Sequence, residues 1–147
     1  SKVLVSLALG LASMTFLALF STFALGADWG NALGVALLIV AGVLAAVGTV
    51  SLVAGVARTP EQAGALQAGI ALVLAIMGGS FFSMARSGGI AAVASKLTPH
   101  YWFNEGLVRM TGGQDWTATF GPIGALLLFA AVVGLPGLVL AGRTVRP

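Results

Sequence analysis

The chain has 147 residues, of which only 7% are charged, and a mean hydropathy of +1.05. A soluble domain carries roughly 25% charged residues, so this composition excludes a soluble globular protein and indicates a membrane protein. The net charge of +3 follows from a few basic residues at one membrane face, described below, and does not indicate a nucleic-acid partner.

Four long apolar runs predict membrane-spanning helices. A spanning helix needs about 20 apolar residues to cross a hydrocarbon core of roughly 30 Å. The runs contain no Asp, Glu, Lys, Arg or His, and they do not alternate polar with apolar residues as barrel strands do. We therefore predict an all-α integral membrane protein in contact with the lipid bilayer, with four transmembrane helices at 3–26, 32–57, 63–84 and 121–142.

Small residues recur in these helices at intervals of four, which lets helix backbones approach closely in lipid. Near the end of the third predicted helix, Gly78 and Gly79 are a candidate helix break. The spaced residues include Gly26, Gly30 and Gly34, and also Gly137 and Ala141.

The turn ARTPEQA separates the second and third predicted helices. Thr59 is a typical N-cap, Pro60 suits the first helical position, and Glu61 is favoured at the positive end of the helix dipole. Gln62 completes a capping box with Thr59. Arg58, Thr59 and Glu61 are thus candidates for a cytoplasmic turn, for which a structural role suffices.

The segment 85–120 is too long for a simple turn and predicts short helices of its own. One is expected over 87–96. A second begins at Pro99 after the cap Thr98 and ends near Met110, before a glycine pair. Its apolar face predicts a re-entrant or interfacial helix that forms a lid over the outer end of the bundle. This face holds Trp102, Phe103, Gly106, Leu107 and Met110.

Polar and aromatic residues of this second short helix are candidates for an outer gate or lid. We expect the apolar face to be buried against the ends of the spans, and His100, Asn104 and Glu105 to face a wet exit path. With one histidine and no cysteine, the chain shows neither a metal-ligand cluster nor a catalytic triad pattern. The gate candidates are His100, Tyr101, Trp102, Asn104, Glu105 and Arg109, and Glu105 precedes Arg109 at ion-pair spacing.

Charge and aromatic residues agree on the orientation of the chain. If the helices alternate in direction, four basic residues and only Glu61 as acid lie on one side, which the positive-inside rule makes cytoplasmic. All tryptophans and the single tyrosine fall on the opposite, outer side, where amphipathic rings favour the headgroup level. The C-terminus is then cytoplasmic. The basic residues are Lys2, Arg58, Arg143 and Arg146.

Three stretches in this order carry a resemblance to a known family: ARTPEQA at 57–63, MGGSFF at 77–82 and LTPHYWFNEGL at 97–107. Glycines at 112 and 113, a final apolar helix and a basic tail follow. With these features the chain resembles the C-terminal part of an ATP-binding-cassette (ABC) exporter permease of the ABC-2 type. The likeness is clearest over 50–142.

The resemblance implies a permease half with six spans that pairs with a second half, as a homodimer or heterodimer, in a bacterial inner (plasma) membrane. The chain would then be one transmembrane permease domain, 1–147, with spans three to six, and the first two spans would be absent. ATP and Mg²⁺ would bind to cytoplasmic ABC ATPase subunits, since this chain has no P-loop motif and is expected to need no cofactor of its own. The cargo would be a small amphipathic molecule, drug or lipid-like compound.

Two other classes stay open. An ion-coupled secondary transporter or channel subunit normally places an ionisable residue within the membrane, and the four predicted helices contain none. A purely structural membrane subunit or anchor fits the composition but does not explain the polar and aromatic segment 97–107, and an intramembrane enzyme is a remaining alternative. The sequence therefore favours a transport subunit without enzymatic activity.

Overall fold

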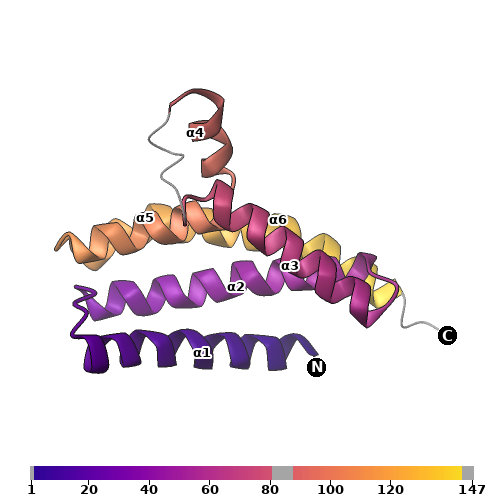
Figure 1. The fold of residues 1–147 in the computed structure, drawn as a ribbon, viewed down its shortest axis with the longest axis horizontal. Coiled ribbons are helices and arrows are strands. Elements are labelled where there is room, and N and C mark those ends of the chain that lie inside the picture. Colours follow the sequence, from indigo (N-terminus) through magenta and orange to yellow (C-terminus); the bar gives the residue numbers. More distant parts are fainter. Residues whose placement is uncertain (1, 81–87, 144–147) are drawn as a thin grey trace.

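The computed structural model describes residues 2–80 and 88–143, and every regular element within these ranges is a helix (Figure 1). Four stretches of the described chain are long and apolar enough to cross a membrane, which confirms the all-α membrane fold. The long helices are α1 (Lys2–Leu25), α2 (Ala32–Val56), α3 (Pro60–Met77) and α6 (Phe120–Arg143). Between the last two lie α4 (Gly89–Lys96), α5 (Pro99–Thr111) and the 3-10 helix η2 (Trp116–Thr119).

The third predicted span is the one whose bounds were wrong. It was expected at 63–84, but α3 begins at Pro60 and ends at Met77; positions 81–84, like the expected start of the first short helix at Ser87, lie outside the described residues. Gly78 caps the helix, and Gly79 has a φ of +82°, a left-handed conformation that ends a helix and that glycine adopts without strain.

Threonine residues cap the N-termini of α3 and α5. The Oγ1 atom of Thr59 accepts a hydrogen bond from the backbone N–H of Gln62 at 3.1 Å, and Thr98 does the same for Tyr101 at 3.3 Å. Gln62 does not complete the expected reciprocal bond to Thr59. Its side-chain oxygen instead accepts from the backbone N–H of Arg58 at 2.8 Å, which closes the turn one residue earlier.

The parallel pair α2 and α6 forms the centre of the bundle, and glycines allow their close approach. A Cβ atom on Gly134 would lie 3.1 Å from the Cα atom of Gly48, and one on Gly137 would clash with the backbone of Leu52. Without a hydrophobic driving force between helices in lipid, such close packing supplies the association energy. Leu38 and Leu126 are completely buried in the resulting core.

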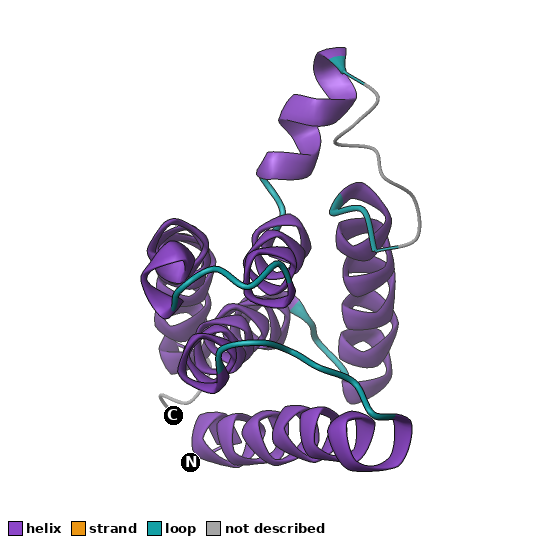
Figure 2. Cartoon of the chain, turned by 90° about the vertical axis from the view of Figure 1, so that its left-hand side faces the viewer, coloured by secondary structure: helices purple, strands orange, loops and turns teal. Residues whose placement is uncertain are grey.

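The helices α1 and α3 lie on the outside of this centre. Figure 2 shows α1 beside the N label and α3 joined to the grey trace, both outside the group formed by α2, α5 and α6. α1 packs against α2, and each of the described residues of α3 is at least partly exposed. Large apolar side chains such as Phe16, Phe23 and Leu72 are more than half exposed, as suits contact with lipid or with further helices.

Two ends of the bundle can be distinguished. The Trp29 end comprises the loop 26–31, the C-terminus of α5 and η2, and corresponds to the predicted outer side. The Arg58 end comprises the turn 57–59 and the C-terminus of α6, and corresponds to the predicted cytoplasmic side, although the tail with Arg146 lies outside the described residues. The short helix α4 projects sideways from the bundle between these ends (Figure 1).

Candidate functional site

The helix α5 packs lengthwise against the first half of α2. In each of three contacts a glycine on one helix leaves room for a larger side chain on the other, because a Cβ at that glycine would clash with it. Residue numbers rise along one helix as they fall along the other, so the helices are antiparallel. From the Trp29 end inward, the contacts pair Met110 with Gly34, Gly106 with Leu38, and Phe103 with Gly42.

These contacts place the start of α5 near the middle of α2. At a rise of 1.5 Å per residue, Gly42 lies about 15 Å along the helix axis from Ala32, the first residue of α2. That distance is about half the thickness of a hydrocarbon core. Of the two predicted alternatives, a re-entrant and an interfacial helix, this depth agrees with the re-entrant one. The expected packing of the apolar face against the ends of the spans was wrong, because the glycines of α2 accept the large side chains of α5 along the helix.

The depth of α5 also corrects the positions expected for two aromatic residues. Tyr101 and Trp102, predicted at the headgroup level, lie next to Phe103 and thus beside the middle of α2. The indole N–H of Trp102 donates to the backbone oxygen of Lys96 at 2.7 Å, which satisfies the polar group of this side chain. Trp29 and Trp116 remain at the Trp29 end.

His100 lies at the junction between the end of α3 and the start of α5. A Cβ on Gly78 would clash with the Cβ of His100, so the two chain segments touch there. The Nδ1 atom of His100 is buried and has no hydrogen-bond partner among the described residues. The structure therefore places His100 in a joint between helices rather than on the wet path predicted for it.

An open groove of about 460 Å³ follows the face of α5 that is turned away from α2. The α5 residues on it recur every three or four positions, which marks one face of a helix. The opposite wall consists of the end of α3 and of Trp29, whose indole N–H donates to Ser21 Oγ at 3.1 Å. The groove thus runs from the middle of α2 to the Trp29 end. It is lined by Trp29, Gly78, Gly79, Ser80, Tyr101, Asn104, Glu105, Leu107, Val108 and Thr111.

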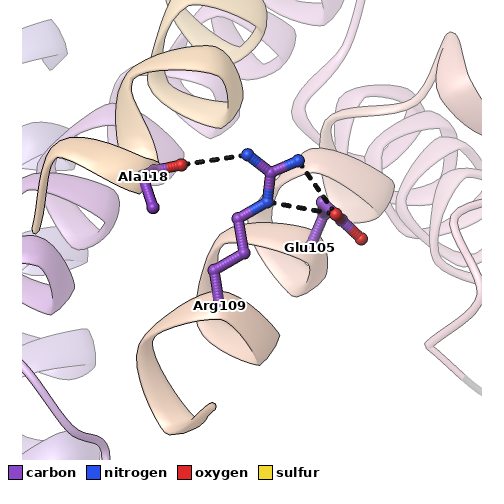
Figure 3. A network of polar contacts seen from close by, with 3 residues as sticks. All are labelled: Glu105, Arg109 and Ala118. Atoms are coloured by element: carbon purple, nitrogen blue, oxygen red, sulfur yellow. Dashed lines mark hydrogen bonds and ion pairs between the residues drawn. The ribbon is translucent and has the colours of Figure 1, made fainter. Parts of the chain in front are cut away.

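Glu105 and Arg109 form an ion pair beside this groove (Figure 3). Arg109 donates from Nε and Nη2 to Oε1 of Glu105 at 3.1 and 3.0 Å, and from Nη1 to the backbone oxygen of Ala118 at 3.0 Å. Because both side chains are about one-third exposed, the pair contributes at most about 0.5 kcal/mol to stability. Its structural effect is to tie α5 to η2 and to fix the direction of the carboxylate.

The structure brings together only part of the predicted gate. Tyr101, Asn104 and Glu105 line the groove together with Gly78 and Gly79, which had been predicted as a separate helix break. His100, Trp102 and Arg109 do not line it. Asn104 donates a long hydrogen bond across the groove, with 3.5 Å between its Nδ2 atom and Ser80 Oγ.

Several groove residues were missed by the sequence analysis. Val108 and Thr111 continue the spacing of Tyr101 and Glu105 along α5, and this periodicity was a usable signal. Trp29 and Ser80 come from other segments, and no sequence pattern pointed to their convergence. Within residues 2–80 and 88–143 no three metal-ligating side chains cluster, and Arg58, Thr59 and Glu61 lie at the opposite end of the bundle.

Comparison with known families decides what kind of protein carries this groove. The model of a family described as ABC-2 family transporter protein matches residues 1–139. The chain belongs to this family. The match confirms the resemblance to ABC-2 permeases. It also covers the first helix, which lies before the range 50–142 where the likeness was clearest. No curated protein and no solved structure matches the chain significantly. As an ABC-2 family member, it is a membrane-embedded transport subunit rather than a catalytic one.

Replacing Trp102 tests how firmly α5 is anchored. Trp102→Ala removes an indole that packs against the core and donates to Lys96. Replacing a fully buried tryptophan with alanine lowers stability by about 3–5 kcal/mol. Because Trp102 is only partly buried, we expect the free energy of unfolding to fall by about 1–3 kcal/mol. Trp102→Phe retains most of the packing and should lose about 1 kcal/mol. Unfolding by SDS, followed by circular dichroism, measures the stability of both variants. A Trp102→Ala variant with the same free energy of unfolding as the wild type would contradict the anchoring role.

Proposed function

We propose that this chain is the permease subunit of an ATP-driven exporter and that the groove along α5 forms part of the exit path for a small amphipathic, drug-like or lipid-like cargo. The observation that carries this proposal is the course of the groove, from the middle of α2 to the Trp29 end. A molecule that leaves the centre of the bilayer through this groove would meet polar side chains of α5 that can bind its polar head. The apolar residues that also line the groove would contact its apolar tail.

The remaining parts of the exporter are supplied by partners. A cytoplasmic ABC ATPase holds ATP and Mg²⁺ and docks at the Arg58 end, where Arg58, Thr59 and Glu61 form a capped turn. A second permease half, identical or related, covers exposed faces of α1 or α3 and completes the path. The basic Arg58 end faces the cytoplasm of a bacterial cell and the Trp29 end faces outward, which is supported by the positive-inside rule.

Energy coupling tests the proposed function. The complete exporter, reconstituted in vesicles, should move a fluorescent amphiphile only when ATP is hydrolysed. The four spanning stretches hold no titratable group beyond Glu61 in the first turn of α3, and Glu105 of the re-entrant helix is held in an ion pair with Arg109. A protonophore should leave the transport rate unchanged at constant ATP. The control is an ATPase partner whose P-loop lysine is replaced, which should show no transport. Transport that collapses with the proton gradient would instead favour an ion-coupled transporter.

A further inference from the structure

We propose that the groove along α5 binds organic cations, with a quaternary ammonium or phosphonium centre held at Glu105 between Tyr101 and Trp29. The proposal rests on the proposed export function and deepens it, because it names the charge class of the cargo. Three features of the groove support it: its single charge, its aromatic walls and the helix end at its mouth.

Glu105 is the only charged residue among the described residues that line the groove. Its partner Arg109 does not line the groove, and the guanidinium is directed toward the backbone oxygen of Ala118. Hydrogen bonds among the described residues reach only Oε1 of Glu105, while Oε2 points away from Arg109 (Figure 3). Arg109 neutralises much of the carboxylate's charge, so the groove meets the negative end of the ion pair, the carboxylate of Glu105, and not its positive end.

Aromatic side chains stand on both sides of this carboxylate along the groove. Tyr101 lies one helical turn further in, and its ring meets that of Trp102 edge to face at 5.2 Å. Trp29 lies toward the outer end and is fixed by its hydrogen bond to Ser21. Rings held in place by protein contacts favour a bulky, weakly hydrated cation, because their faces are electron-rich.

The end of α5 adds to the preference for positive charge. Thr111, the last residue of this helix, lies at the outer part of the groove, where the helix dipole presents its negative end. A bare metal ion needs several converging oxygen ligands, and the described residues contain no such cluster. The chemistry of the groove therefore fits an organic cation with apolar substituents and disfavours both an anion and a metal ion.

Equilibrium binding to the permease in lipid nanodiscs tests the proposal without ATP or a partner. The probes are tetraphenylphosphonium and tetraphenylborate, which share a shape and differ in the sign of their charge, and empty nanodiscs correct for partition into lipid. We expect corrected binding of the phosphonium and at least tenfold weaker corrected binding of the borate. Equal binding of both ions, or binding of neither, would overturn the proposal on the wild-type protein alone.

A matched pair of variants locates the site. Glu105→Gln keeps the size of the side chain and removes its charge, and should weaken phosphonium binding about tenfold. Asp115→Asn makes the same charge change near the Trp29 end but at a residue that does not line the groove, and should change the affinity less than about twofold. Equal weakening by both substitutions would indicate a general surface potential and would contradict the site.

The binding assay and the transport assay separate the two proposals. Loss of cation selectivity with intact ATP-driven efflux of neutral amphiphiles would reject the cation site and leave the exporter function standing. Selective cation binding by a protein that shows no ATP-driven efflux would support the cation site and reject the exporter function.

Discussion

Replacing Gly137 with alanine is expected to remove most of the folded protein. A Cβ at this position would overlap the backbone of Ser51 and Leu52, and backbone atoms of a packed helix cannot rotate away as a side chain can. Overpacking typically costs about 1–3 kcal/mol, and we expect about 3 kcal/mol or more here because α2 and α6 would have to separate. The measurement is the monodisperse fraction of detergent-extracted protein on size-exclusion chromatography.

Gly124 provides the matched control on the same helix. It is exposed, and a Cβ there would meet no described atom within 4 Å. Because alanine favours helix over glycine by about 1 kcal/mol, Gly124→Ala should extract as well as the wild type or better. Similar yields for Gly124→Ala and Gly137→Ala would mean that α2 and α6 do not pack as closely as described.

The second large effect is expected at Gly30, a residue of the loop after α1 that packs against the end of α5. Its φ is +76°, and a Cβ would clash with the backbone oxygen of Met110. Gly30→Ala should therefore push the Trp29 loop away from the end of α5, widen the groove and abolish efflux. We expect the free energy of unfolding to fall by about 3 kcal/mol, from backbone strain of about 1–2 kcal/mol and overpacking of similar size.

Gly26 separates these two contributions. Its φ of +66° imposes the same conformational strain, but a Cβ there would meet no described atom within 4 Å. Gly26→Ala should therefore cost only about 1–2 kcal/mol in SDS unfolding and should retain efflux. If both alanine variants unfold and transport alike, the contact between the loop and Met110 does not hold the groove in shape.

The spanning helices and caps could be predicted from the sequence because their causes are local. Long apolar runs without charges must form helices in lipid, and Thr59 and Thr98 cap the residues that directly follow them. The third span was predicted too long because its hydropathy continues past Gly78 and Gly79. The positive φ of Gly79 ends the helix there, and hydropathy does not register backbone conformation.

The sequence left open whether α5 is re-entrant or interfacial, because its depth depends on the pairing of two distant segments. An amphipathic, aromatic helix is typical of a membrane interface when it is considered alone. Only when α2 is placed beside it do Gly34 and Gly42 become spaces for Met110 and Phe103. The interval of four between Gly26, Gly30 and Gly34 was similarly misleading: Gly34 is helical, whereas the other two form the loop before α2.

The pairing of α2 with α6 has a consequence for how the protein is made. α3, α4 and α5 are all synthesised between these two helices, so the glycine face of α2 around Gly48 has no partner until α6 follows Thr119 out of the ribosome. Bringing distant segments together also carries the entropy cost of closing a long loop. Assembly of the core is therefore a late event in biogenesis, during which α2 must remain in the bilayer as an individually stable span.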